Sequence, residues 1–268
     1  MTRKITMLGT GNATVTKCYN TCFTISQGDK HFLVDAGGGN GILTQLERAD
    51  INLRDLEGMF LTHAHTDHIL GAVWVIRMVA TRMDNGTFEA DFPIYCHEEA
   101  AHVLQTLCDL TLAKKHKKFL EERIVIRVVK DGQKVVMNGK EFTFFDIHST
   151  KMKQFGFQLI WEDKMRLICL GDEPYSEVSS VYAKGTDWLM SESFCLYRDK
   201  ERFKPYEKHH STALDAGKMA EELGVKNLIL YHTEDKNLAE RRRLYTEEAK
   251  TYYTGNVVVP DDLEIVEL

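Results

Sequence analysis

Three histidines and an aspartate fall within the segment THAHTDH, residues 62–68. His63 and His65 are two positions apart, so an extended backbone would turn both imidazoles to the same side. Asp67 and His68 follow where the next apolar run begins. Zinc prefers neutral imidazoles and carboxylates as ligands, and iron and manganese accept the same groups. The spacing therefore allows two imidazoles to bind one ion, and the second pair to bind another ion nearby.

The crowding of this segment argues against four unrelated side chains. Burying three imidazoles and a carboxylate between two apolar runs costs free energy unless a partner compensates for it. A lone histidine elsewhere, such as His31 or His116, is better interpreted as a surface residue or a hydrogen-bonded core residue. The cluster instead predicts a metal site.

Further polar side chains stand at the ends of other apolar runs. Asp35 ends FLVD, His148 ends TFFDIH, Asp172 ends LICLGD, and His232 ends LILYH. Side chains at the same end of neighbouring strands converge on one cleft, where loops commonly carry functional sites. The last three residues could complete two metal sites, and an aspartate between two ions is a natural bridging ligand.

Two successive groups of elements would position these residues. Alternating and apolar runs predict strands over 4–8, 22–26, 31–35, 56–65, 92–97, 123–129, 133–137, 141–148, 156–162, 165–172 and 226–235. Helical spacing predicts helices over 41–49, 68–83, 98–110, 211–225 and 238–253. In the fourth helix, Thr212 and Asp215 are spaced as a capping box and Gly224 marks the end. Strand meanders separated by helices favour two sheets packed face to face and covered by helices.

Composition restricts the class of protein. The 268 residues contain no long linker, repeat or low-complexity tract, which predicts a single domain over 1–268. A net charge of -6 provides no global attraction to nucleic acid or to an anionic membrane. The longest apolar segment, residues 69–83, contains two arginines and is too short to span a bilayer. The N-terminal residues lack the apolar stretch of a signal peptide, so we expect a cytoplasmic protein.

The motif and its flanking pieces resemble the metallo-β-lactamase superfamily. THAHTDH matches the H-x-H-x-D-H signature, and VDAGGG, LGD and LYHT follow the order of the other motifs. The resemblance implies an α/β fold, a four-layer αββα sandwich, with a dinuclear metal site. It also implies the ligands: His63, His65 and His148 on one ion, Asp67, His68 and His232 on the other, with Asp172 bridging and Asp35 supporting the ligands from behind.

Two more stretches resemble ribonuclease Z and its phosphodiesterase relatives, namely MLGTGNA and HHSTALDAGKMAEELGVKNLILYHT. This similarity implies that His210 lies beside the metals as a proton donor or phosphate contact. Ser211, Thr212 and the preceding Lys208 are then candidate substrate-binding residues. The alternative is that this loop only introduces a helix capped by Thr212. The resemblance also implies a homodimer.

The expected reaction follows from the expected site. Two divalent transition-metal ions about 3.5–4 Å apart, with zinc expected and manganese or iron as alternatives, can hold a bridging hydroxide and stabilise an in-line displacement at phosphorus. Asp67 would orient the nucleophile, and His210 would protonate the leaving oxygen. The sequence thus predicts a phosphodiesterase acting on a small or cyclic nucleotide or on an RNA 3′ end.

Two other reactions use the same kind of metal site. One is hydrolysis of another ester, a thioester or a lactone. The other is tRNA 3′ processing, but ribonuclease Z proteins carry a tRNA-gripping arm between the third and fourth motifs. Here only about one β-hairpin joins His148 to Asp172, which disfavours tRNA as the substrate.

Overall fold

The computed structural model describes residues 2–120 and 122–268, and their contacts group into two compact units. The first unit comprises the described residues of Met1–Ala13, Cys18–Val129 and Asp261–Leu268. The second comprises Thr14–Lys17 and those of Lys130–Pro260. Within the described residues, each unit contains one seven-stranded mixed sheet. The α/β class expected from the sequence is therefore present in both units.

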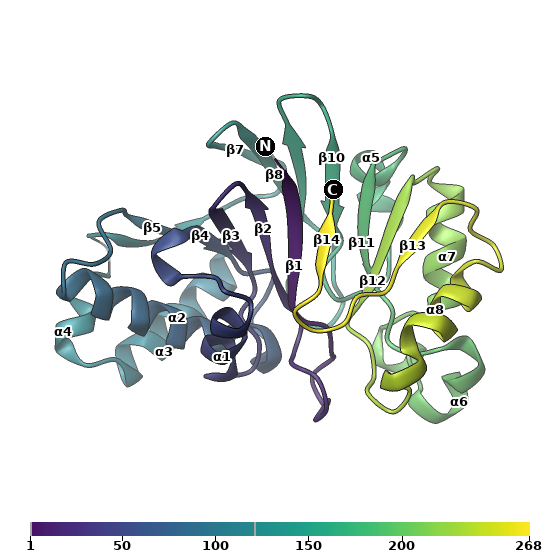
Figure 1. Ribbon diagram of the computed structural model, residues 1–268, viewed down its shortest axis with the longest axis horizontal. Coiled ribbons are helices and arrows are strands. Elements are labelled where there is room, and N and C mark those ends of the chain that lie inside the picture. Colours follow the sequence, from purple (N-terminus) through teal and green to yellow (C-terminus); the bar gives the residue numbers. More distant parts are fainter. Residues whose placement is uncertain (1, 121) are drawn as a thin grey trace. The chain divides into compact units, whose positions relative to one another are not determined.

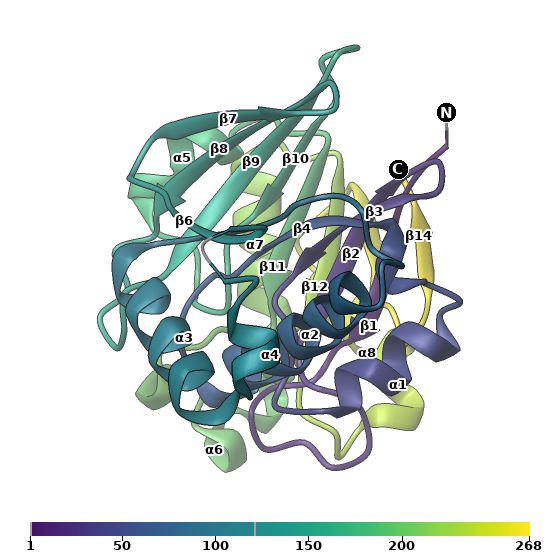
Figure 2. The same ribbon diagram turned by 90° about the vertical axis from the view of Figure 1, so that its left-hand side faces the viewer.

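The first unit is a sheet with helices on one face (Figures 1 and 2). The strand order is β14-β1-β2-β3-β4-β5-β6, antiparallel from β14 to β3 and parallel from β3 to β6. The strands are β1 (Arg3–Gly9), β2 (Cys22–Gln27), β3 (Lys30–Val34), β4 (Leu56–Phe60), β5 (Phe92–Cys96), β6 (Ile124–Val128) and β14 (Ile265–Glu267). The helices are α1 (Gly41–Arg48), α2 (Thr66–Asp84), α3 (Glu98–Thr111) and α4 (Lys114–Lys117).

Apolar periodicity explains how these helices attach to the sheet. The buried face of α2 presents Val75, Ile76 and Val79, spaced at helical intervals, to the same core as Leu33 and Ile94 of the strands. Removing these side chains from water is the main force that holds α2, and with it the histidine motif, on the sheet. None of the described helices combines the length and apolar character that crossing a bilayer requires.

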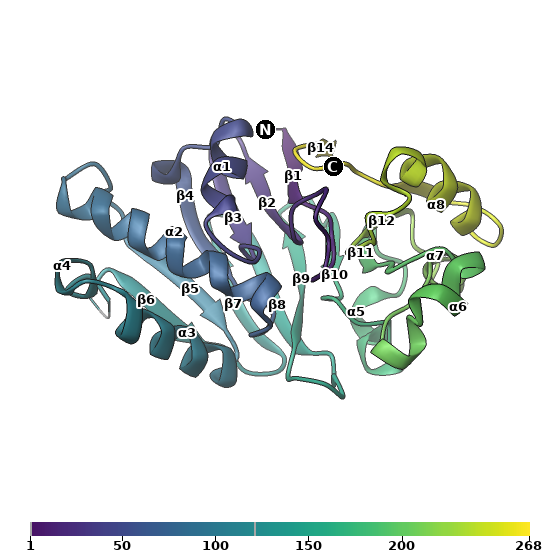
Figure 3. The same cartoon turned by 90° about the horizontal axis from the view of Figure 1, so that it is seen from below.

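The second unit has the strand order β13-β12-β11-β10-β9-β8-β7. Strands β7 to β10 are antiparallel neighbours, and β10 to β13 are parallel. Its core joins the sheet to α7 and α8, which lie on one face of β11 and β12 (Figures 1 and 3). The strands are β7 (Gln133–Met137), β8 (Lys140–Asp146), β9 (Phe155–Trp161), β10 (Arg166–Cys169), β11 (Trp188–Glu192), β12 (Asn227–Tyr231) and β13 (Asn256–Val258). The helices are α5 (Ser180–Ala183), α6 (Lys200–Phe203), α7 (Ala213–Glu222) and α8 (Arg241–Ala249).

The elements expected from apolar runs are present, with ends shifted by a few residues. The capping box of Thr212 and Asp215 at the start of α7 is confirmed, as is the helix end at Gly224, whose φ is 63°. The sequence did not predict β11, because WLMSE lacks alternation and β-branched residues. This strand forms through pairing with β10 and β12 on its two sides. The prediction of a single domain over 1–268 concerns the association of the two units and stays a prediction.

Candidate metal and catalytic residues

The histidine motif of the first unit spans the turn from β4 into α2. His63 follows β4 after two residues, His65 is the N-cap of α2, and Asp67 and His68 lie in its first turn. His63 Nε2 is 2.8 Å from His65 Nδ1, and the rings of His63 and His68 have centroids 4.2 Å apart. Asp67 Oδ2 lies 3.4 Å from His68 Nε2. The structure thus brings these four predicted ligands together, three of them buried and His65 half-buried.

Asp35 fixes the ring of His68 from behind. Its carboxylate accepts hydrogen bonds from the Thr62 backbone N–H (2.9 Å), the Thr62 hydroxyl (2.8 Å) and His68 Nδ1 (2.7 Å). Because Nδ1 donates to Asp35, the lone pair of the neutral ring resides on Nε2, the atom that a metal would use. This contact would let Asp35 support a metal-bound His68, the role that the resemblance implied, which stays a prediction.

The surroundings of His68 favour positive charge. Burial disfavours the charged ring, but the carboxylates of Asp35 and Asp67 outweigh it and raise the pKa of His68 well above its ordinary value. The same carboxylates would stabilise a cation bound at Nε2. Together with the imidazoles of His63 and His65, this donor set fits a divalent transition metal.

A close backbone contact sets the position of α2 against the segment that follows β3. The Ala36 N–H donates to the His68 carbonyl (3.0 Å), and the Gly71 N–H donates to the Gly37 carbonyl (2.9 Å). A Cβ added at Gly71 would lie 1.8 Å from the Ala36 carbonyl oxygen. Only glycine permits this approach, which keeps Asp35 within reach of His68.

In the second unit, parallel strands bring polar residues to one edge. Asp172, Glu192 and His232 stand at the carboxyl ends of β10, β11 and β12, which are adjacent in the sheet. Asp172 Oδ2 lies 3.6 Å from His232 Nε2, and both residues are buried. The convergence of Asp172 and His232 predicted from strand ends is therefore observed.

Glu192 is a functional candidate that the sequence did not reveal. It is fully buried, its Oε1 accepts the Ser211 N–H (2.6 Å), and its Oε2 lies 3.6 Å from His210 Nδ1. The ligand atoms of Glu192, His210 and His232 all lie within 4.8 Å of one another. The available signal was a carboxylate at the end of a strand, but recognising it required the prediction of β11.

His210 sits in the loop before α7 and is 8% exposed. Its ring stacks on Phe194 with centroids 4.6 Å apart, and lies 5.2 Å from the ring of His232. Lys151 Nζ, from the loop between β8 and β9, is 3.5 Å from His210 Nε2. A titratable imidazole thus lies beside a predicted metal ligand, with a basic side chain next to it.

Three other predicted positions have different surroundings. His148 is exposed, and the groups of potential ligands among the described residues of the second unit do not include it. The Ser211 hydroxyl donates to the Glu192 carbonyl (3.3 Å), and the Thr212 hydroxyl donates to Asp215 Oδ2 (2.6 Å). Thr212 therefore has the capping role, and metal or substrate contacts of His148, Ser211 and Thr212 stay predictions.

Three predicted site residues adopt left-handed backbone conformations. The φ angles are 53° at Asp35, 57° at His148 and 59° at His232. Such conformations cost non-glycine residues about 1–3 kcal/mol and occur preferentially at functional sites. Each of the three directly follows a strand or lies a few residues beyond its end, so the turn aims the side chain away from the strand direction.

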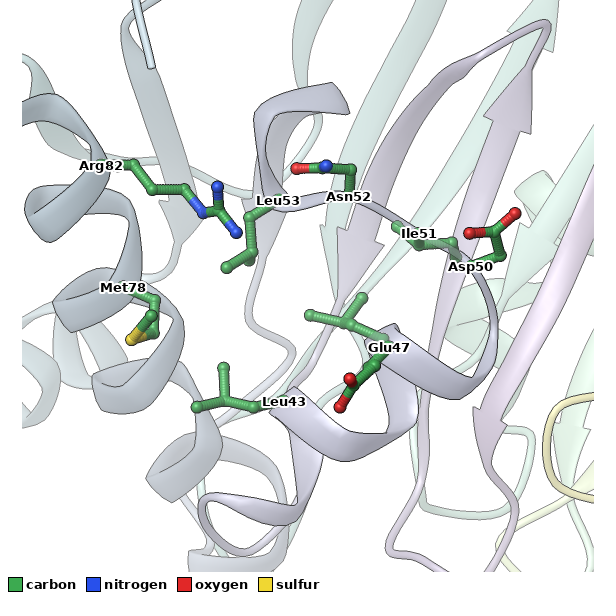
Figure 4. A pocket seen from close by; sticks show the side chains of 9 residues that line it. Leu43, Glu47, Asp50, Ile51, Asn52, Leu53, Met78 and Arg82 are labelled. Carbon is green, nitrogen blue, oxygen red and sulfur yellow. The ribbon is translucent and has the colours of Figure 1, made fainter. Parts of the chain in front are cut away.

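A separate cavity lies between α1, the following loop and α2 (Figure 4). Its volume is about 390 Å³, and leucines and Met78 make up much of its lining with Arg82 at one end. None of the predicted site residues lines it.

Comparison with known proteins agrees with the fold and the motifs. The metallo-beta-lactamase fold protein YhfI from Bacillus subtilis superposes on this chain with a TM-score of 0.80 at 21% identity, covering 100% of both chains. A diphosphatase from the PhnP family superposes with a TM-score of 0.75 at 18% identity, covering 99% of this chain and 98% of that one. The ribonuclease Z of Methanothermobacter thermautotrophicus is 26% identical over 312 aligned residues, covering 99% of this chain and 96% of the relative.

These similarities show that the chain has the metallo-β-lactamase fold, and that its sequence is similar to that of a ribonuclease Z over nearly its whole length. The predicted α/β metallo-β-lactamase fold is confirmed by this likeness and by the two mixed sheets with their helices. The chain belongs to the family described as Anti-Pycsar protein Apyc1, whose model matches residues 3–246.

Proposed function

We propose that this protein is a metal-dependent phosphodiesterase that hydrolyses small or cyclic nucleotides. The observation that carries the proposal is the arrangement of His210 in the second unit, held between Glu192 and Phe194 and beside His232. An ester hydrolase that expels a good leaving group has little need for a proton donor, whereas cleavage of a nucleotide P–O bond benefits from one. The names of the ribonuclease Z relative and the PhnP-family diphosphatase support chemistry at phosphorus.

The proposed cofactors are two divalent transition-metal ions, with zinc expected and manganese or iron as alternatives. Imidazole and carboxylate donors in buried positions fit these ions. When bound, the ions supply a water-derived nucleophile at neutral pH and neutralise charge on the phosphoryl oxygens. The proposed ligands are His63, His65, Asp67, His68, His148, Asp172 and His232.

The residues of the chain have separate tasks in the proposed reaction. The Asp67 carboxylate orients the attacking water, and the Asp35 carboxylate holds the ring of His68. His210 donates a proton to the leaving oxygen, and Glu192 is a positioning residue that faces His210 Nδ1. Lys151 Nζ supplies positive charge next to the same ring.

Several features favour a small substrate over tRNA. Short loops join β8 to β9 and β9 to β10, so no protruding arm stands between His148 and Asp172. The alignment with ribonuclease Z spans 312 positions, more than the 268 residues of this chain, so the relative contains segments that this chain lacks. The net charge of -6 also provides little of the phosphate binding that a tRNA requires.

Other proposed properties rest on the resemblance. Lys208, which is exposed with its Nζ 5.1 Å from the Phe194 ring centroid, is proposed to contact substrate, together with Ser211 and Thr212 of the same loop. A homodimer and a cytoplasmic location are also proposed.

A substrate panel with matched histidine variants tests the function. The metal-loaded protein is assayed with bis(p-nitrophenyl) phosphate, 3′,5′-cyclic nucleotides, a thioester and a lactone. His210→Asn removes the proposed proton donor, and His209→Asn is the control, because Asn tolerates the left-handed backbone of His209 (φ 56°). We expect His210→Asn to lower kcat on the cyclic nucleotides, whose alkoxide leaving group needs a proton, by about 10²–10⁴-fold. The loss on bis(p-nitrophenyl) phosphate, which releases the good leaving group p-nitrophenolate, should be smaller, and His209→Asn should change either rate little.

Two results would contradict the proposal. One is faster turnover of the thioester or lactone than of any phosphodiester. The other is an unchanged rate of cyclic nucleotide hydrolysis by folded His210→Asn, which would remove the proton donor from the reaction.

A further inference from the structure

A cationic cavity on the first unit shares no residue with the proposed catalytic site. It has a volume of about 380 Å³ and lies where α2, the end of α3 and α4 meet. Its lining consists of Arg77, Met78, Thr81, Thr111, Ala113, Lys115 and His116.

His116 is the buried polar group of this cavity. It is 4% exposed, and its Nε2 lies 3.2 Å from the Thr81 hydroxyl oxygen. The single hydroxyl proton of Thr81 is donated to the Arg77 carbonyl (2.8 Å), so Nε2 must be the donor to Thr81. Nδ1 is buried and has no hydrogen-bond partner among the described residues. A neutral His116 therefore carries an unsatisfied lone pair, which a proton and an anion together would satisfy.

The two cations of the lining have no acidic partner in the described part of the chain. Arg77 packs over the Trp74 ring at 5.6 Å from its centroid. The Lys115 ammonium makes no hydrogen bond or ion pair with the described residues, although its charge contributes to the lowered pKa of Asp84. Two neighbouring lysines differ in this respect. Lys117 donates to the Asp109 carbonyl (2.9 Å), and Lys118 pairs with Asp84 (2.6 Å).

These charges act on His116. Burial, Lys115 and Arg77 together hold the pKa of His116 below its ordinary value, against the opposing effect of Asp84 at the end of α2. Thr111, the residue from α3 in the lining, donates its hydroxyl proton to the Leu107 carbonyl and carries no charge. Positive potential in the cavity is therefore compensated only in part by the protein.

We propose that this cavity binds a small tetrahedral dianion, the phosphate group of inorganic phosphate or of a phosphomonoester. Arg77 and Lys115 would supply positive charge that compensates the dianion, and His116 Nδ1 would donate a hydrogen bond after taking up a proton. Both threonine hydroxyls already donate to helix carbonyls, so recognition depends on the three nitrogen-bearing side chains. The proposal does not depend on the catalytic function.

The test uses the full chain and follows the ring signals of His116 by NMR, assigned by their loss in His116→Gln. Sulfate is the first probe, because it stays a dianion between about pH 5.5 and 8 while the imidazole titrates. Sulfate should shift the His116 signals and raise the pKa of the ring. The affinity for sulfate should rise by up to about tenfold for each pH unit of acidification between the raised pKa of the ring in the sulfate-bound protein and the lower pKa of the ring in the free protein.

Lysine variants separate a built site from diffuse attraction. Lys115→Gln should weaken sulfate binding about tenfold, since it removes one charge-assisted contact. Lys114→Gln removes the same charge from the same helix but lies outside the lining, and should weaken binding less than about twofold. Both lysines are exposed, so these variants remain informative if His116→Gln does not fold.

Titration with inorganic phosphate and with 5′-AMP then identifies the source of the phosphate. Tighter binding of 5′-AMP supports a nucleotide ligand, and equal or tighter binding of inorganic phosphate supports free phosphate. The proposal is overturned if none of the three anions moves the His116 signals. It is also overturned if Lys114→Gln and Lys115→Gln weaken sulfate binding equally.

Discussion

Replacing Asp35 by asparagine tests how the first unit prepares His68 for a metal. The carboxylate accepts three hydrogen bonds at 2.7–2.9 Å, from the backbone and hydroxyl of Thr62 and from His68 Nδ1. An asparagine amide has only one acceptor oxygen. If that oxygen keeps the Thr62 N–H, its NH₂ group faces His68 Nδ1, and the ring must move its proton to Nε2. The lone pair intended for the metal is then lost.

The magnitude follows from the burial of this network. Asp35 is 3% exposed and His68 1%, so a lost charge-assisted hydrogen bond is not replaced by water. We expect Asp35→Asn to lower the free energy of unfolding by about 1.5–3 kcal/mol. Because the outer partner of a metal-bound histidine fixes its tautomer, metal affinity or turnover should fall by about 10–100-fold.

Urea unfolding of the metal-free protein and turnover of bis(p-nitrophenyl) phosphate measure the two effects. Thr62→Val is the comparison, since it removes the hydroxyl hydrogen bond but leaves the contact between Asp35 and His68. Thr62→Val should lower the free energy of unfolding but retain most of the turnover. The reasoning is refuted if Asp35→Asn binds metal and turns over substrate within about twofold of the original chain.

Three further expectations concern stability. Gly71→Ala places a Cβ 1.8 Å from the Ala36 carbonyl oxygen and should cost about 1–3 kcal/mol in thermal unfolding, whereas Gly39→Ala, with open space around it, should be nearly neutral. Thr212→Ala removes one half of the capping box and should cost about 0.5–2 kcal/mol; an unchanged melting temperature would contradict a capping role. Burial is the main cause of the lowered pKa of His31, so the unfolded chain binds more protons there, and stability should fall as pH drops through about 6.5; His31→Gln should reduce that slope in acid titrations.

The motif residues could be predicted because their signals are local. A buried strand that ends in THAHTDH places polar side chains at a junction where burial is costly, and the spacing alone identifies possible ligands. The same logic found Asp172 and His232, whose strands are apolar runs that end at the polar residue. In the structure both lie at the carboxyl ends of parallel strands in one mixed sheet.

Glu192 could not be found in this way, because its strand has no intrinsic pattern. WLMSE becomes β11 only through hydrogen bonds to β10 and β12, which are distant in sequence. The left-handed backbone at Asp35 and His232 was also hidden, since neither residue type requires it and tertiary packing imposes it. Capping by Thr212 was visible because it depends on residues only three positions apart.

Metal content measured together with turnover tests the central claim most directly. Elemental analysis of the purified protein should find about two transition-metal ions per chain. Removing them with a chelator should abolish hydrolysis of bis(p-nitrophenyl) phosphate, and adding them back should restore it. His68→Ala should lose both metal and turnover while remaining folded. A folded, metal-free protein that hydrolyses the substrate at the full rate would contradict the account.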